Sequence, residues 1–245
     1  MMVVSAVHFC SGSEETVPLT LKSRFVGNVY VIQCVGSIVL GEEVKALEAL
    51  LDARSVEFSR FVLDLAELSR LDSIGMGALV RYADRFGRRG GGLRLAAPPA
   101  FVTKLLEMTM LSGLLLQYPT EEEAIVSFLK QGSEQGAQGK RGPRVLMFDP
   151  SADLCTFVRS VLMRHGFDVR TTCLLHDARV LLRVDGVEYI LVGPGTEQLP
   201  QETMAKSLES LSPGAGMLKL DREFGSRDAG DATEVLLQMF GVERG

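Results

Sequence analysis

The sequence contains no tryptophan, and aromatic residues make up only 7% of its 245 residues. Proteins that stack bases of single-stranded nucleic acids depend on such side chains, so this composition argues against a stacking platform. A basic surplus is missing as well, because 26 Lys and Arg stand against 31 Asp and Glu, a formal net charge of −5. We therefore expect no nucleic-acid partner.

Long apolar runs are also missing. No stretch reaches the roughly 18 continuous apolar residues that a membrane-spanning helix needs. The segment from Met1 to Cys10 is apolar, but it has neither the basic region nor the long apolar core of a signal peptide. The sequence therefore predicts a cytoplasmic protein without a membrane partner.

Cysteines are few and widely spaced, at positions 10, 34, 155 and 173. This spacing is not that of a disulfide framework, so it favours reduced and mostly buried thiols. Cys173 and His176 are spaced like two metal ligands, but no further ligand is visible beside them. A buried cysteine and a surface histidine explain the pair better, and no metal or cofactor is predicted.

Signatures of catalysis are absent too. The Gly75-x-Gly77 and Gly193-x-Gly195 patterns lack the third glycine of a dinucleotide fingerprint, and no phosphate loop ends in Gly-Lys-Ser/Thr. The three histidines lie far apart in the sequence and suggest no catalytic triad. The sequence therefore predicts a protein that is not an enzyme.

One segment divides the chain. Residues 131–143 contain no large apolar side chain and are dominated by Gly, Gln and Ser. Such a segment cannot bury enough surface to order itself, so it predicts a flexible linker. The linker separates a domain over 16–130 from a domain over 144–245, and each is large enough for one core.

The first domain alternates strand and helix patterns, which predicts an α/β layer fold. Apolar and β-branched runs indicate the strands, and apolar residues at helical spacing, with capping residues, indicate the helices. The strands are expected over 29–35, 61–65, 93–97 and 114–116, and the helices from 42, over about 75–89, after Pro98-Pro99 and after Thr120.

The segment from Val62 to Leu79 carries the most information, because a buried strand runs into a loop that ends in Asp72-Ser73 at a helix start. Either residue could cap the helix by accepting a backbone N–H bond. Ser73 could instead be a phosphorylation site, since a helix N-terminus tolerates a phosphate. That phosphate would add a charge of about −1.5 to −2 and could eject a closely packed partner. The residues alone leave both interpretations open.

These residues resemble the STAS domain of anti-sigma factor antagonists over about residues 16–130. The blocks that carry the resemblance agree with that family in spacing and in residue type. They are Asp64-Leu65, Leu71-Asp72-Ser73-Ile74-Gly75-Met76-Gly77-Ala78-Leu79 and Arg88-Arg89-Gly90-Gly91-Gly92-Leu93-Arg94-Leu95, with further likeness over 36–43, 105–111 and 121–124.

The resemblance implies a small α/β domain with a mixed β-sheet and a phosphorylation switch on Ser73. It also implies that the unphosphorylated form binds an anti-sigma factor that is a serine kinase, and that a phosphatase resets the switch. The partner-binding residues expected on this basis are Asp72, Ser73, Ile74, Gly75, Met76, Ser37 and Val39.

Val39 stands where many such domains carry an acidic residue. This departure favours an alternative, in which the STAS fold acts without phosphorylation as a scaffold in a chemosensory or stress-sensing complex. The two hypotheses differ in whether a change at Ser73 alters the set of partners.

The second domain has a βαβαβ pattern over 144–192, which predicts a parallel sheet. It resembles the flavodoxin-like receiver domain of response regulators. Asp149 matches one of that family's acidic pair, but Pro150 occupies the other place and Gly193 the phosphoacceptor position. Lys219 is the counterpart of the family's late lysine. We expect a degenerate receiver-like module that takes no phosphate and serves for binding or for homodimerisation.

Overall fold

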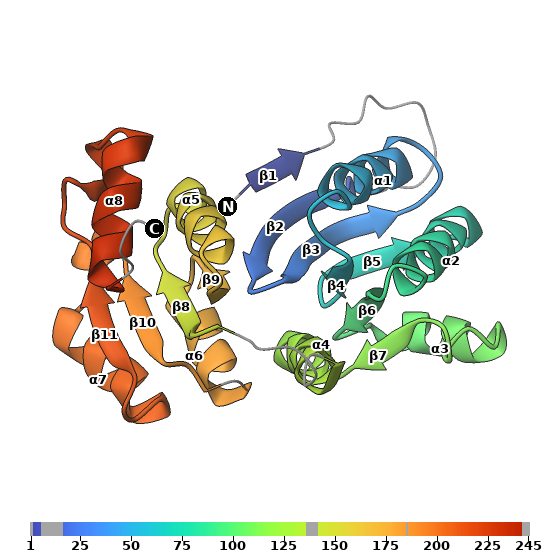
Figure 1. Cartoon of the computed structure of the whole chain (residues 1–245). Coiled ribbons are helices and arrows are strands. Elements are labelled where there is room, and N and C mark those ends of the chain that lie inside the picture. Colours follow the sequence, from blue (N-terminus) through green and yellow to red (C-terminus); the bar gives the residue numbers. More distant parts are fainter. Residues whose placement is uncertain (1, 6–16, 136–141, 185, 242–245) are drawn as a thin grey trace. The chain divides into compact units, whose positions relative to one another are not determined.

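The structure is a computed structural model that describes residues 2–5, 17–135, 142–184 and 186–241. The chain divides into two compact units (Figure 1). The first unit comprises Met1–Arg24 with Asn28–Phe128, and the second comprises Phe25–Gly27 with Leu129–Gly245. Each combines strands with helices, which confirms the predicted α/β class. Among the described helices, none combines the length and the apolar character that crossing a membrane requires.

The first unit is built on a mixed sheet. Strand β3 pairs in parallel with β4, β4 with β6, and β6 with β7, while β2 lies beside β3 and β1 pairs antiparallel with β2. The strands are β1 (Met2–Ser5), β2 (Thr20–Val26), β3 (Val29–Ile38), β4 (Arg60–Asp64), β5 (Leu68–Leu71), β6 (Gly92–Ala96) and β7 (Leu116–Tyr118).

The long strand β3 changes partner along its length. It pairs with β4 over Val29–Gln33 and with β5 over Gly36–Ile38, with a shift of register after Gly36. Gly36 has a φ of 104°, and a Cβ there would lie 2.4 Å from the backbone oxygen of Pro18. Only glycine fits this bulge. The bulge lets β5 form in a segment that the sequence indicated as a loop.

The helices of the first unit follow the expected pattern (Figure 1). The capping box predicted at Thr120 is present, because the Glu123 backbone N–H donates to Thr120 Oγ1 over 3.2 Å. They are α1 (Glu42–Arg54), α2 (Ser73–Gly87), α3 (Ala100–Met108) and α4 (Glu121–Gln135).

Helix α4 continues to Gln135, into the segment predicted as a linker. Extending an existing helix by residues such as Gln and Glu costs little, which explains how a segment without apolar residues can still be helical. Residues 136–141 of the predicted linker lie outside the described residues.

An aromatic cluster fixes α2 on the sheet. The ring of Phe86 in α2 stacks on Phe61 in β4 with 4.3 Å between the centroids, and Tyr30 and Phe58 extend the cluster. Phe61 and Phe86 are fully buried. Each such side chain stabilises the fold by about 1.5–3 kcal/mol through burial, so the position of α2 is set by its packing.

The second unit has a four-stranded parallel sheet in the order β9-β8-β10-β11. Numbered from β8, this order is 2-1-3-4, as in the first four strands of flavodoxin-like sheets. The elements are β8 (Arg144–Phe148), α5 (Ala152–Arg164), β9 (Asp168–Thr172), α6 (Leu175–Val184), β10 (Tyr189–Val192), η1 (Pro194–Gln198), α7 (Gln201–Leu211), β11 (Gly216–Lys219), η2 (Phe224–Ser226) and α8 (Ala229–Met239).

Candidate functional site

Asp72 is the cap of α2. Its backbone is extended, its Oδ1 accepts the Gly75 N–H over 2.7 Å, and its Oδ2 accepts the Leu40 N–H over 2.7 Å. One carboxylate therefore joins the start of α2 to the connection between β3 and α1. Of the two capping candidates in the sequence, the structure selects Asp72.

Ser73 is the first residue of α2 and lies at the surface. Within the described parts of the chain, its hydroxyl group has no hydrogen-bond partner. The interpretation of Ser73 as the helix cap is therefore wrong, because Asp72 already fills that role. The Ser73 hydroxyl is exposed to solvent at the positive end of the helix dipole.

Two apolar residues near Ser73 are exposed. Leu40 is 71% exposed and Ile74 is 44% exposed. The hydrogen bond from Leu40 to Asp72 brings the β3–α1 connection next to the start of α2. Leu40 is not among the predicted partner-binding residues, because it follows an apolar strand and its sequence position is typical of a core residue. Its position next to Gly41, just before a helix start, could have indicated that Leu40 lies in an exposed connection.

Other predicted partner-binding residues lie beneath this surface. Gly75, Met76 and Ser37 are buried, and the Ser37 hydroxyl lies 3.1 Å from that of Ser69. They support the exposed surface and do not form it. Val39 is half-buried at the end of β3. The surface itself is formed by Leu40, Asp72, Ser73 and Ile74, which we call the α2 start surface.

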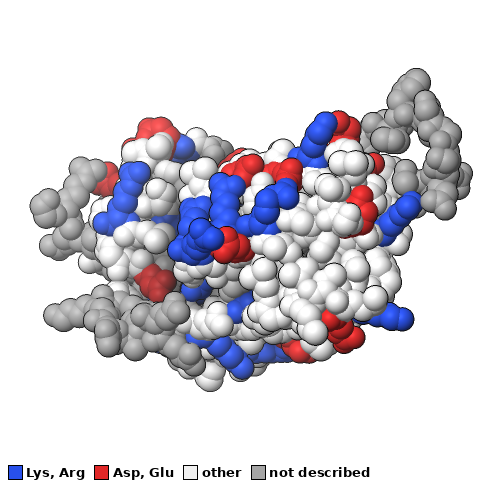
Figure 2. Space-filling view, turned by 90° about the vertical axis from the view of Figure 1, so that its right-hand side faces the viewer, with Lys and Arg blue, Asp and Glu red and all other residues white. Residues whose placement is uncertain are grey.

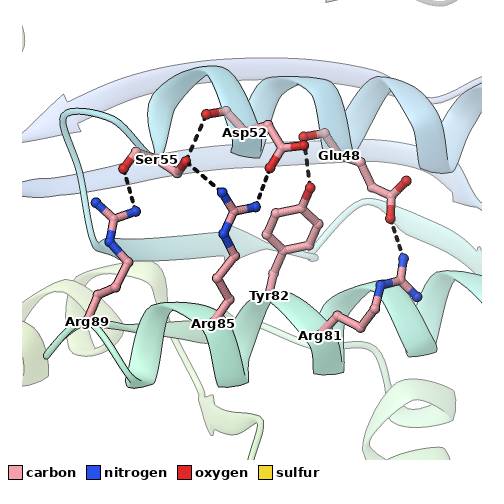
Figure 3. A network of polar contacts seen from close by, with 7 residues as sticks. All are labelled: Glu48, Asp52, Ser55, Arg81, Tyr82, Arg85 and Arg89. Carbon is pink, nitrogen blue, oxygen red and sulfur yellow. Dashed lines mark hydrogen bonds and ion pairs between the residues drawn. The ribbon is translucent and has the colours of Figure 1, made fainter.

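Arginines in α2 and just after it contact α1 and the residue that follows α1 (Figure 3). Arg81 pairs with Glu48, Arg85 pairs with Asp52, and Arg89 donates to the backbone oxygen of Ser55. The side chains of Arg81 and Arg85 remain 62% and 50% exposed. Exposed ion pairs contribute about 0–1 kcal/mol each, so this row orients the two helices more than it stabilises them.

Tyr82 in α2 also contacts α1. The Tyr82 hydroxyl donates to the backbone oxygen of Glu48 over 3.2 Å, and burial together with Asp52 raises the pKa of Tyr82 to about 12. On the face that Figure 2 shows, basic and acidic side chains lie next to one another.

The predicted receiver site of the second unit lies where β8 and β10 end. Asp149 is 1% exposed, its Oδ1 accepts the Ser151 N–H over 2.7 Å, and its Oδ2 accepts the Gly195 N–H over 2.8 Å. A Cβ on Gly193 would lie only 2.3 Å from Asp149 Oδ2. The Asp149 carboxylate thus occupies the space that a side chain at position 193 would need.

The remaining predicted residues of this site are Pro150, directly after Asp149, and Lys219. Pro150 is exposed, and Lys219 Nζ lies 3.4 Å from Gln201 Oε1 and 4.0 Å from Glu197 Oε1. Among the described residues, no group of three or more His, Cys, Asp or Glu side chains could hold a metal ion. The spacing of Cys173 and His176 therefore gains no support as a metal site.

Comparisons with known proteins bear on the first unit. Among solved structures, SpoIIAA of Bacillus in its phosphorylated form is 21% identical with a TM-score of 0.37, and the match covers 43% of this chain and 96% of that chain. An anti-sigma factor antagonist from Mycobacterium paratuberculosis is 23% identical with a TM-score of 0.39. That match covers 45% of this chain and 93% of the other chain. No curated protein matches the chain.

The family comparison is more specific. The model that describes the STAS domain matches residues 20–124, which carry β2 to β7, all of α1 to α3 and the start of α4. The match does not extend to residues 144–245, so the receiver-like resemblance of the second unit stays a prediction. Residues 20–124 of this chain form a STAS domain.

Proposed function

We propose that the first unit is an anti-sigma factor antagonist. In this proposal it binds an anti-sigma factor that is also a serine kinase, and phosphorylation of Ser73 by that kinase ends the binding. The supporting observation is the exposed hydroxyl of Ser73 at the first position of α2, beside the exposed Ile74 and near the connection that carries the exposed Leu40. A phosphatase then returns the protein to its binding form.

The physical basis is a difference between the free and the bound protein. In the free protein, a phosphate on Ser73 remains hydrated and lies at the positive end of α2, so the fold tolerates it. A partner that covers Leu40 and Ile74 would remove water from a charge of about −1.5 to −2. The nearby Asp72 carboxylate adds repulsion. A loss of about 3 kcal/mol corresponds to more than a hundredfold weaker binding.

The test compares two variants of the full chain in a pull-down from native lysate. Ser73→Ala is expected to retain a kinase-like anti-sigma factor, and Ser73→Asp is expected to lose it, with an affinity at least about tenfold lower because of the buried charge. Ser210→Asp is the matched control, since it adds the same charge at an exposed serine of α7. Loss of the same partner from Ser210→Asp would contradict a switch located at Ser73.

A second candidate function is a scaffold that binds its partners without phosphorylation. One observation favours it: the half-buried side chain at position 39 is valine, so it brings no carboxylate to the β3–α1 connection. The same experiment separates the two functions. If both Ser73 variants retain the same partners, the scaffold function replaces the switch.

For the second unit we propose a binding or dimerising module that takes no phosphoryl group. Position 193 has no side chain, and both oxygens of the buried Asp149 carboxylate already accept backbone N–H groups. We therefore expect that acetyl phosphate leaves no acid-labile aspartyl phosphate in residues 144–245 of the full chain, as measured by peptide mapping. A receiver domain of known activity, treated in parallel, is the positive control. An acid-labile phosphate mapped to Asp149 would overturn this proposal.

A further inference from the structure

Two cysteines of the second unit, Cys155 and Cys173, lie near the ends of strands β8 and β9. Cys155 lies in the first turn of α5 and is fully buried in the core. Its Sγ donates to the backbone oxygens of Asp149 over 3.4 Å and of Thr172 over 3.6 Å. Cys173 is the residue after Thr172, so the Cys155 thiol lies against the backbone from which the side chain of Cys173 emerges.

Cys173 packs against the buried core cluster that contains Cys155. The interaction between the two thiols lowers the pKa of Cys173 and raises that of Cys155. Partial burial and the carboxylates of Asp149 and Asp177 oppose the shift at Cys173. The thiolate is the reactive form of cysteine. The pair is therefore asymmetric, with Cys173 as the nucleophile and Cys155 as a thiol held next to it.

Access to solvent distinguishes the two sulfurs. Cys173 is only partly buried and is followed by Leu174, which is 47% exposed. The Leu174 N–H donates to Thr172 Oγ1 over 3.3 Å, and this turn fixes the backbone around Cys173. A small oxidant reaches a partly buried sulfur more readily than a fully buried one, so Cys173 is expected to react first.

We propose that Cys155 and Cys173 are a peroxide-responsive pair that closes into a reversible disulfide. The Cys173 thiolate attacks one oxygen of hydrogen peroxide, the O–O bond breaks, and the second oxygen leaves as hydroxide, which takes up a proton to become water. The sulfenic acid on Cys173 is then attacked by the Cys155 sulfur, the S–S bond forms, and a second water leaves. Both sulfurs are oxidised and the peroxide is reduced, and an added dithiol reverses the step.

The third described cysteine provides a control within the same chain. Cys34 in β3 is fully buried, its Sγ lies 4.0 Å from the backbone oxygen of Ile32, and burial raises its pKa. Neither of the other described cysteines contacts it. Cys34 is therefore expected to stay reduced when the pair oxidises.

The experiment treats the full-length protein with hydrogen peroxide, blocks the remaining thiols by alkylation and maps tryptic peptides by mass spectrometry. We expect the peptides 145–159 and 171–179 to appear joined, with the loss of two hydrogens, and to separate after dithiothreitol. Cys34→Ala is expected to give the same joined peptide. Cys173→Ser is expected to abolish it and to leave Cys155 unoxidised.

Three outcomes would overturn the proposal. One is a wild-type Cys173 that advances to sulfinic acid without forming the joined peptide. Another is a disulfide between Cys173 and Cys10 in place of Cys155. The third is a joined peptide in which Cys34 is the partner. Because the readout is made on the wild-type chain, it does not depend on the folding of any variant, and it is independent of the function proposed for Ser73.

Discussion

Replacing Gly75 by alanine is expected to lower the free energy of unfolding of the first unit by about 3 kcal/mol. A Cβ at this position would lie 2.4 Å from the backbone oxygen of Ile38 and 2.9 Å from side-chain atoms of Ile38 and Leu71. The backbone oxygen belongs to β3 and cannot turn away, so α2 would have to move. Its movement would break the hydrogen bond between Gly75 N–H and Asp72.

Gly77→Ala is the matched control, two residues further along the same helix. A Cβ there would meet only the end of Arg81, at 3.8 Å. Alanine is favoured over glycine inside a helix by about 0.5–1 kcal/mol, so this variant is expected to be more stable than the natural chain. Urea unfolding followed by circular dichroism measures both effects. A Gly75→Ala variant as stable as Gly77→Ala would contradict the close packing of α2 on β3.

The second large effect is expected in the second unit, where Gly193→Ala should lower the free energy of unfolding by about 3 kcal/mol or more. The added Cβ would lie 2.3 Å from Oδ2 and 2.7 Å from Cγ of Asp149. To make room for the Cβ, the buried Asp149 carboxylate must move and lose its hydrogen bond from the Gly195 N–H. A buried charge would then lose half of its hydrogen bonds.

Thermal unfolding of the full chain, followed with a probe in the second unit, tests this expectation. Gly225→Ala is the matched control, because no atom lies within 4 Å of a Cβ at that position. The double variant Asp149→Ala/Gly193→Ala gives a further check. If the two side chains compete for one space, the double variant loses less stability than the sum of the single variants. If the stability losses of the two single variants simply add in the double variant, then competition between the two side chains does not cause the loss in Gly193→Ala.

Much of the fold could be predicted from local patterns. The strand–helix alternation, the capping box at Thr120 and the parallel sheet of the second unit follow from apolar periodicity and turn chemistry. Strand β5 could not be predicted, because its two middle residues are exposed and it exists only through pairing with the bent end of β3. Helix α7 has only two buried residues, Met204 and Leu208, and its pattern was too weak to detect.

The candidate site was predicted in part. The sequence placed Asp72 and Ser73 at a helix start, but it could not decide which of them caps the helix, because both side chains are suitable. Three-dimensional contact was needed to show that Asp72 also holds Leu40. In the second unit, the sequence indicated that Gly193 lacks a phosphoacceptor. It could not indicate that the Asp149 carboxylate fills the same space.

The two hydrogen bonds of Asp72 have a consequence for the exchange of backbone hydrogens with solvent. The N–H groups of Leu40 and Gly75 are far apart in the sequence, yet both are protected by one carboxylate. When that side chain swings away, both amides open in the same event and exchange at coupled rates. We therefore expect the amides of Leu40 and Gly75 to exchange together and faster than those of the strands below them.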